Sequence, residues 1–416
     1  MDKKPEKLVP EVRFKGFTDD WEQRELGDIT NYIKGYAFKS ASYQAKGNVL
    51  LIRASDLSSG TLAFLPDKKY LPSQFLETFK RYKLNQGDIV ITTVGSKSTM
   101  KSSAVGRPIY INSNKPYLLN QNLVKITVND SINSFYLYNQ LLKSKYKYFV
   151  STIERGNANQ ANITIHDLWK YKAFLTSELE EKQIGHLLLK LNQLFYLQQR
   201  KLEQLRQLKI FSLQRMFIDK DCKQPILRFK NFNDNWLPHK FNDIANTFSG
   251  GTPAISNKDY YGGNIPFIRS AEINKNTTQL HLTPDGLKNS SAKFIKKGTL
   301  LYALYGATSG EVGIAQIDGA INQAVMAINL KKDNVYFIKT WLIKNKRKII
   351  STYLQGGQGN LSAKIVKHLK LSLPKIEEEN LISITIMKID SLIKLQQSKI
   401  DQLTILKKYL LQKLFI

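Results

Sequence analysis

The chain is poor in the residues that carry most metal and redox chemistry. It has one cysteine, Cys222, in 416 residues. A single thiol excludes an internal disulfide, a cysteine zinc cluster and a dithiol redox pair. The five histidines offer no two at metal-ligand spacing and none in a carboxylate arrangement typical of a general base; they are His166, His186, His239, His281 and His368. We therefore expect no metal and no catalytic residue in this chain.

Acidic residues and long apolar runs are also scarce. The 34 Asp and Glu stand against 62 Lys and Arg, which gives a net charge of +28. Such an excess indicates a polyanionic partner such as nucleic acid, although a lysine-rich protein of an AT-rich genome is the alternative. No run of about 18 apolar residues is present, and the start "MDKKPEKLVPEVRF" has no apolar signal segment. We expect a cytoplasmic protein that contacts no membrane.

Two short motifs come close to known chemistry and fail. "NKPY" at 114–117 differs from the Asn-Pro-Pro-Tyr box of amino-methyltransferases at its second position, and no glycine-rich cofactor loop accompanies it. "GSKST" at 95–99 lacks the spacing of an ATP phosphate loop. We therefore predict that the chain binds no cofactor and is not an enzyme.

What the sequence does contain is an internal repeat. Residues 10–29 and 225–244 agree at nine of twenty positions, and residues 194–218 and 392–416 agree at thirteen of twenty-five. Two shorter echoes keep the same order, "LIRASDL" with "FIRSAEI" and "LNQNLVKI" with "INQAVMAI". Conserved order over the whole chain indicates a duplication whose ends are alike and whose middle varies.

The ends of the two halves read as long helices. Ser177 and Glu180 have capping-box spacing, and Glu377 to Glu379 stand at the positive end of the second helix. Residues at three- and four-residue steps predict an antiparallel coiled-coil seam, in which Gln198 and Gln396 face each other. Amphipathic helices on separate cores are the alternative. The seam residues are Leu188, Leu191, Phe195, Gln198, Leu202, Leu205, Ile386, Ile389, Ile393, Gln396, Ile400 and Leu403.

Taken together and in this order, the motifs resemble the specificity subunit of a type I restriction-modification system. The motifs that carry the resemblance are the duplicated "RFKGFTDDW" and "RFKNFNDNW", "KGYAFKS", "SGGTP", "YYGGNIPFIRSAEI", "YGATSGEVGIA", the "LNQ" and "INQ" pair and the twin terminal helices. The first half departs from the second at "GSKSTMKSSAVG" (95–106), where the second has "GATSGEVG". This difference leaves the form of that loop open.

The resemblance implies an α+β fold with two pseudo-symmetric globular target-recognition domains joined by two long antiparallel coiled-coil helices. Each domain is expected to read one half of a bipartite double-stranded DNA target. The expected divisions are an N-terminal domain at 1–178, a first spacer helix at 179–218, a linker at 219–226, a C-terminal domain at 227–375 and a second spacer helix at 376–416. A 38-residue helix is about 57 Å long, so its length would set the unread gap between the half-sites.

The resemblance also implies partners. Two modification subunits, which methylate adenine at N6 with S-adenosylmethionine, are expected to dock on the helices. Restriction subunits that use ATP and magnesium are expected to join through that complex. The alternative is a stand-alone DNA-binding regulator, which would not need a methyltransferase partner.

The candidate DNA contacts lie in the loops between the strands. Cations suit phosphates, whereas amides and hydroxyls match base edges. Asn120, Gln121, Asn322 and Gln323 match adenine, although their place before apolar strands also favours backbone capping. The other candidates are Lys34, Tyr36, Lys39, Lys97, Ser98, Thr99, Lys101, Arg155, Asn157, Asn159, Gln160, Ser249, Thr252, Tyr305, Thr308, Ser309, Gln355, Gln358 and Asn360.

Overall fold

The fold was analysed in a computed structural model, which describes residues 8–58, 61–62, 67–100, 104–157, 160–219, 222–353 and 360–416. The chain forms two compact units. Unit 1 is Met1–Gln199 with Ser398–Ile416, and unit 2 is Arg200–Gln397. Each unit therefore contains part of each long helix.

Unit 1 is built from a two-stranded ribbon and two four-stranded sheets. The ribbon pairs β1 (Glu22–Glu25) with β15 (Lys172–Leu175). The first sheet has the order β10-β8-β12-β2, with bounds Pro108–Tyr110, Ile89–Thr92, Leu123–Val128 and Thr30–Lys34. The second has the order β6-β3-β11-β7, with bounds Tyr70–Leu71, Val49–Ile52, Tyr117–Leu119 and Lys83–Leu84. Three very short pairings complete the strands: β4 (Leu57–Ser58) with β5 (Thr61–Leu62), and β14 (Ala161–Asn162) with both β13 (Arg155–Gly156) and β9 (Val94–Gly95).

Unit 2 repeats the topology of the ribbon and of both four-stranded sheets. Its ribbon pairs β16 (Leu237–Lys240) with β25 (Lys370–Leu373). Its first sheet has the order β17-β24-β21-β22, with bounds Ala245–Ser249, Val325–Leu330, Leu300–Ala303 and Val312–Ile314. Its second has the order β19-β18-β23-β20, with bounds Leu280–Leu282, Tyr261–Ile268, Gly319–Ile321 and Lys293–Ile295. In both units one pair of the second sheet is parallel, β3 with β11 and β18 with β23. The sequence repeat is therefore a structural repeat.

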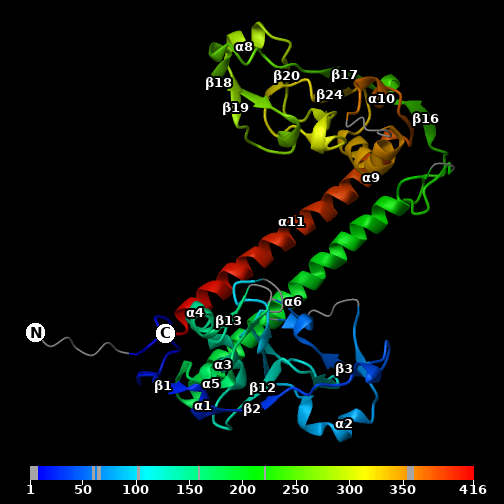
Figure 1. Ribbon diagram of the computed structural model, residues 1–416. Helices are drawn as coiled ribbons and strands as arrows, with labels where there is room; N and C mark the ends of the chain where they lie inside the picture. The colour runs from blue at the N-terminus through cyan, green and yellow to red at the C-terminus, as the bar shows by residue number, and fades with distance from the viewer. Residues whose placement is uncertain are drawn as a thin grey trace, which may run out of the picture. The chain divides into compact units, whose positions relative to one another are not determined.

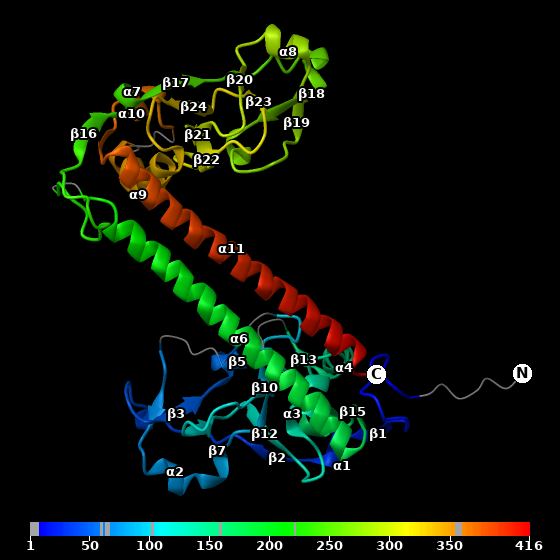
Figure 2. The same ribbon diagram turned by 180° about the vertical axis from the view of Figure 1, so that it is seen from behind.

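Short helices cover the sheets. In unit 1 they are α1 (Leu26–Ile29), α2 (Phe75–Thr78), α3 (Ser134–Gln140), α4 (Ser144–Ile153) and α5 (Ile165–Trp169). In unit 2 they are α7 (Phe241–Ile244), α8 (Pro284–Lys288), α9 (Val335–Tyr353) and α10 (Ala363–Lys367). Six 3-10 turns complete the described elements: Ser40–Ser42, Ala54–Asp56, Lys80–Tyr82, Lys258–Tyr260, Ser270–Glu272 and Gly306–Thr308. In unit 1, α2 and β3 lie on the side away from β1 and α3; in unit 2, α8 and β18 lie away from α9 and β16 (Figures 1 and 2).

The two long helices are α6 (Glu178–Arg215) and α11 (Ile376–Lys413), of 38 residues each. Within unit 2 they run antiparallel, because Arg206 reaches Gln397 while Lys209, one turn further along α6, reaches back to Asp390 at 2.6 Å. All twelve predicted seam residues are buried or half-buried, and Gln396 is 3% exposed. That Gln198 faces Gln396 stays a prediction.

The helices end three residues earlier than the predicted boundaries 218 and 416. The chain leaves the helix because the last residues turn into a core: Phe217 and Phe415 are 2% and 3% exposed. Phe415 packs edge-on against Trp21 at 6.3 Å between ring centroids, and Phe217 does the same against Trp236 at 6.3 Å. Each unit thus buries the start of one long helix and the end of the other in one core.

The segment predicted as a linker, 219–226, is partly folded onto unit 2. Lys344 on α9 donates to the Asp219 carboxylate at 2.9 Å, and Gln224 donates to the Asn233 carbonyl at 2.7 Å. Residues 220–221 lie outside the described part of the chain. The described ends of this segment are tied down by side chains.

Buried glutamates near both helix starts make stability depend on pH. Glu181 and Glu379 accept hydrogen bonds from the backbone N–H groups of Asn133 and Asn334 at 3.0 and 2.7 Å. Burial raises the pKa of Glu181 to about 7 and that of Glu379 to about 8, from an ordinary value of 4.5. Between pH 4.5 and the raised pKa of each glutamate, the folded state holds more protons than the unfolded state. The free energy of unfolding therefore falls as pH rises through this range.

We expect the free energy of unfolding to decrease from pH 5 to pH 8 and the Glu379→Gln variant to lose part of that slope, because its amide does not titrate. Urea denaturation at one-unit pH intervals measures both slopes. A variant whose slope equals that of the wild type would show that Glu379 stays ionised in the fold.

Candidate nucleic-acid interface

In unit 1 the loop after β2 lies on the segment that holds Asn120 and Gln121. Tyr36 N–H donates to the Leu119 carbonyl at 3.1 Å, and Gln121 N–H donates to the Tyr36 carbonyl at 3.0 Å. A Cβ on Gly35 would stand 1.8 Å from the Asn120 carbonyl oxygen, so only glycine permits this approach. Two candidate segments that are 85 residues apart in sequence therefore share one surface.

The other two candidate segments of unit 1 join the same edge. Thr93 N–H donates to the Asn122 carbonyl at 2.8 Å, and Ile163 N–H donates to the Thr93 carbonyl at 3.0 Å. Ser98 N–H donates to the Glu154 carboxylate at 2.7 Å, which fixes the loop after β9 against the start of the 155–160 loop. Four loops predicted to contact DNA thus converge at one end of the first sheet.

Unit 2 brings together the equivalent four segments. Gly250 N–H donates to the Val325 carbonyl at 3.4 Å, and the Thr252 hydroxyl donates to the Gln323 amide oxygen. Leu304 N–H donates to the Ala324 carbonyl and Leu361 N–H to the Leu304 carbonyl, both at 2.8 Å. The loops that hold Thr252, Gln323, Tyr305 and Asn360 therefore meet as in unit 1.

Tyr36, like the candidate Tyr305 of unit 2, is an aromatic ring at the surface. It is 39% exposed, and its ring lies 4.7 Å from Phe79, 4.9 Å from Phe38 and 5.3 Å from Tyr82, measured between centroids. Exposed lysines Lys34 and Lys39 flank it in the chain. The side chain can present an aromatic face beside cations, which suits a nucleic acid.

Several candidates are engaged in shaping their own loops. Asn157 accepts from Gln160 N–H at 3.0 Å, and Asn360 accepts from Gly306 N–H at 3.3 Å. Arg155 forms an ion pair with Asp167 at 3.1 Å, although it stays 68% exposed. These three side chains stabilise the turns of their own loops and are nevertheless exposed to solvent.

Ser309 is the one described candidate whose side chain is buried. It is 7% exposed and its hydroxyl donates to the Leu304 carbonyl at 2.9 Å, so it closes the turn instead of facing a ligand. The remaining described candidates are exposed or half-buried: Lys34, Tyr36, Lys39, Lys97, Ser98, Thr99, Asn120, Gln121, Arg155, Asn157, Gln160, Ser249, Thr252, Tyr305, Thr308, Asn322, Gln323 and Asn360. Lys101, Asn159, Gln355 and Gln358 lie outside the described residues.

Sequence reasoning missed two arginines that hold each unit to its long helix. Arg13 binds Glu180 through two hydrogen bonds of 2.7 and 2.8 Å, and Arg228 binds Glu378 through two of 2.8 Å. Glu180 therefore does not complete the predicted capping box, although its N–H donates to the Ser177 hydroxyl at 3.3 Å. The sequence contains a signal for these ion pairs, because both the arginine and the glutamate recur at matching positions of the repeat.

Arg53 and Arg269, by contrast, form ion pairs within the turns that follow their own strands. Arg53 contacts Asp56 and Arg269 contacts Glu272, each at 3.1 Å. Both carboxylates are buried and both accept from the arginine's own N–H. These arginines close the turn after a core strand in each unit.

The described residues give no sign of a metal or membrane site. No group of three or more His, Cys, Asp or Glu within the described ranges is placed to hold a metal ion. No helix in the same ranges has the length and apolar character needed to cross a membrane.

Comparison with known proteins agrees with the duplicated architecture. The family model described as "Type I restriction modification DNA specificity domain" matches residues 18–207 and again residues 233–404. The protein named as the type I restriction enzyme MjaX specificity subunit of Methanocaldococcus jannaschii is 24% identical over 415 residues, covering 95% of this chain and 93% of that protein. The EcoAI specificity subunit of Escherichia coli is 27% identical over 146 residues, covering 34% of this chain and 23% of that protein.

Solved structures share the fold. The S subunit of a type I restriction-modification system from M. genitalium superposes with a TM-score of 0.65 at 14% identity, covering 98% of this chain and 99% of that chain. A chain from a structure on complex assembly and conformational transition of the type I system gives a TM-score of 0.53 at 16% identity, covering 99% of each chain. At these identities the structures establish the architecture alone.

Proposed function

Because this chain belongs to the type I restriction-modification DNA specificity family, we propose that each of its two units reads one half of a bipartite DNA target. The observation that carries the proposal is the duplicated convergence of four loops at the end of the first sheet of each unit. These loops offer cations for phosphates and amides, hydroxyls and a tyrosine for bases. The net charge of +28 favours the same partner.

We further propose that the long helices set the gap between the half-sites and dock two modification subunits. At 1.5 Å per residue, a 38-residue helix is about 57 Å long, comparable to one and a half turns of B-DNA. Exposed apolar residues recur at matched positions of both helices, which favours two copies of one partner. The matched pairs are Leu194 with Leu392, Leu197 with Leu395, Leu208 with Leu406 and Phe211 with Tyr409.

The chain would then contribute recognition and no chemistry. Methylation of adenine with S-adenosylmethionine, and ATP- and magnesium-dependent restriction, would belong to the partner subunits. Membership of the specificity family favours this division.

Adenine-methylation mapping tests the function directly. Genomic DNA from cells that hold this gene and its modification partner is compared, by single-molecule sequencing, with DNA from cells that lack only this gene. We expect a bipartite motif with a fixed gap to lose N6-methyladenine. Unchanged methylation would contradict the proposal and favour a DNA-binding regulator that acts alone.

Two glycine substitutions test the loop site itself. Gly35→Ala places a Cβ 1.8 Å from the Asn120 carbonyl oxygen, and Gly250→Ala places one 1.8 Å from the Ile321 carbonyl oxygen. Either loop must move away from its neighbouring segment, so we expect specific DNA affinity to fall at least about tenfold, because base contacts depend on loop position.

Binding of each variant to the mapped target and to an unrelated duplex, in the assembled complex, separates the effects. Non-specific affinity, which depends mainly on phosphates, should stay within about twofold. Equal specific affinity for the variants and the wild type would place base recognition elsewhere.

A further inference from the structure

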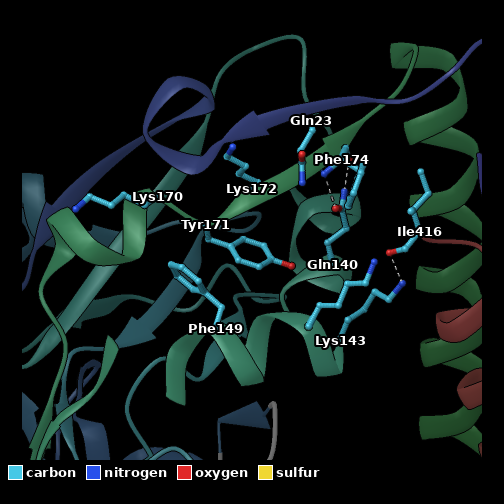
Figure 3. Close-up of a pocket in the computed structure, with 10 residues that line it drawn as sticks. Gln23, Gln140, Lys143, Phe149, Lys170, Tyr171, Lys172, Phe174 and Ile416 are labelled. Atoms are coloured by element: carbon cyan, nitrogen blue, oxygen red, sulfur yellow. Dashed lines mark hydrogen bonds between the residues drawn. The ribbon is translucent and has the colours of Figure 1, made fainter. Parts of the chain in front are cut away.

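A lysine-lined pocket of about 320 Å³ opens on unit 1 (Figure 3). It lies between β1, the ends of α3 and α5, the start of α4, and β15. None of its ten lining residues is acidic and none is a predicted DNA contact; they are Gln23, Gln140, Lys143, Lys145, Phe149, Lys170, Tyr171, Lys172, Phe174 and Ile416.

The walls of the pocket are aromatic and held in place. The rings of Phe149 and Tyr171 lie 5.3 Å apart, and Figure 3 shows them side by side. Gln140 binds the strand on the far wall through both ends of its amide, donating to the Phe174 carbonyl at 2.5 Å and accepting from Phe174 N–H at 2.9 Å. The pocket is therefore a preformed cavity with apolar surface below its charged rim.

The cations of the rim are incompletely neutralised. Lys143 donates to the carbonyls of Phe415 and Ile416, and burial together with neighbouring Lys145 lowers its pKa to about 8. Lys170 shares the Asp167 carboxylate with Arg155. Among the described residues, Lys145 and Lys172 have no carboxylate within 4 Å, although Glu25 is the strand partner of Lys172. A negative group in the pocket would relieve this concentration of charge.

Unit 2 shows what the equivalent lysines bind. Lys344 and Lys346 occupy the places of Lys143 and Lys145, because Lys344 donates to the Ile218 carbonyl as Lys143 donates to that of Ile416. Lys344 also binds the Asp219 carboxylate at 2.9 Å, and Lys346 binds Glu311. In unit 2 the chain's own carboxylates thus bind both lysines, whereas no side-chain carboxylate of the described residues forms an ion pair with Lys143 or Lys145.

We propose that the pocket of unit 1 binds an acidic segment of a modification subunit, with carboxylates on Lys145 and Lys172 and an apolar side chain against Phe149 and Tyr171. This inference rests on the proposed function, which supplies such a partner. Protein is favoured over DNA because phosphates would leave the aromatic wall unused, and because Glu311 binds Lys346, the equivalent of Lys145, through a carboxylate.

The test is charge reversal at the two lysines. The Lys145→Glu/Lys172→Glu variant should bind its cognate modification subunit about 10- to 100-fold more weakly at 0.1 M salt, with a much smaller loss at 0.5 M salt, since the lost interaction is ionic. The control Lys46→Glu/Lys115→Glu changes the net charge equally at two exposed lysines outside the pocket, and should bind as the wild type does. Titration calorimetry with the purified modification subunit measures the affinity, and circular dichroism confirms folding.

The outcomes separate this inference from the proposed function. If the wild-type chain does not bind the modification subunit, both are overturned. If the wild type binds and the charge-reversed variant binds equally well, only the pocket assignment is overturned. If affinity for the modification subunit is unchanged but affinity of the assembled complex for DNA falls, the pocket holds phosphates instead. Should the reversed variant misfold, Lys145→Ala/Lys172→Ala replaces it, with a loss of about 3- to 30-fold expected.

Discussion

The double variant Leu197→Asp/Leu395→Asp should fold normally and fail to assemble with modification subunits. Leu197 and Leu395 occupy matched positions of α6 and α11, and both are 61% exposed. A large apolar side chain this exposed on a helix, repeated at the same place in the second copy, is typical of a surface that a partner covers. A carboxylate in the centre of such an interface would be buried without a counter-charge.

The four matched pairs form one face on each helix. At 3.6 residues per turn, the positions of Leu194, Leu197, Leu208 and Phe211 fall within about 100° of one another. Their exposed fractions and those of their α11 partners run from 42% to 61%. The predicted seam lies on an adjacent face of the same helix. The seam residues pack in the helix pair, whereas the four matched apolar pairs are exposed to solvent. An open second stripe in both copies favours two equivalent docking sites.

We expect affinity for the modification subunit to fall at least about 100-fold in the double variant. The control Gln214→Asp/Gln412→Asp adds the same charges at another exposed matched pair, about 100° around the helix from the leucines. Co-purification and calorimetry report assembly, and thermal melting reports the fold. An assembled complex of wild-type affinity in the leucine variant would remove the docking role from this face.

Only some features of these two helices could be predicted from the sequence. The duplication and the apolar spacing predicted two long helices, because periodicity indicates which residues share a face, although both helices end three residues before the predicted boundaries. Periodicity could not show that a second apolar stripe stays exposed, since which stripe is covered depends on the whole tertiary structure. Leu197 and Leu395 were therefore overlooked although both lie in the repeat that was aligned.

The recognition loops show the same limit. Cations, amides and hydroxyls between the predicted strands indicated which loops are candidates for DNA contact. The fold brings these candidate segments together in each unit. The role of an individual side chain depends on backbone contacts between distant segments, such as Gly35 against Asn120, which a single sequence does not display. Ser309 illustrates the result: a hydroxyl in a promising loop is buried in the closure of its own turn.

Removing Arg13 should cost unit 1 about 3–5 kcal/mol of stability, because it leaves the Glu180 carboxylate buried and unpaired. The Arg13 side chain is 12% exposed and that of Glu180 is fully buried. The neighbouring Val12 N–H donates to the Lys413 carbonyl at 2.9 Å, so this short segment joins the start of α6 to the end of α11. Arg228 and Leu227 repeat the arrangement in unit 2, where Leu227 N–H donates to the Arg215 carbonyl at 2.8 Å.

Two further variants distinguish the effect of an unpaired buried carboxylate from the effect of losing any positive charge. The double variant Arg13→Met/Glu180→Met should regain most of the lost stability, since a buried ion pair replaced by apolar side chains is often neutral. The control Arg24→Met breaks an ion pair with Glu22 whose side chains are 42% and 66% exposed, and should cost less than about 1 kcal/mol. Urea denaturation of the three variants measures the free energies.

A loss below about 1 kcal/mol for Arg13→Met would mean that solvent reaches Glu180, and the segment would then be held by Trp21 and backbone contacts alone. The expected large loss, matched by Arg228→Met in unit 2, would show that one duplicated ion pair fixes both helix starts. The segment that contains Arg13 or Arg228 also contacts the end of the opposite helix in its unit. Breaking its ion pair should therefore expose Phe415 or Phe217 and weaken helix pairing in that unit. The duplicated arginine is thus expected to protect the helix pair on which the proposed docking face depends.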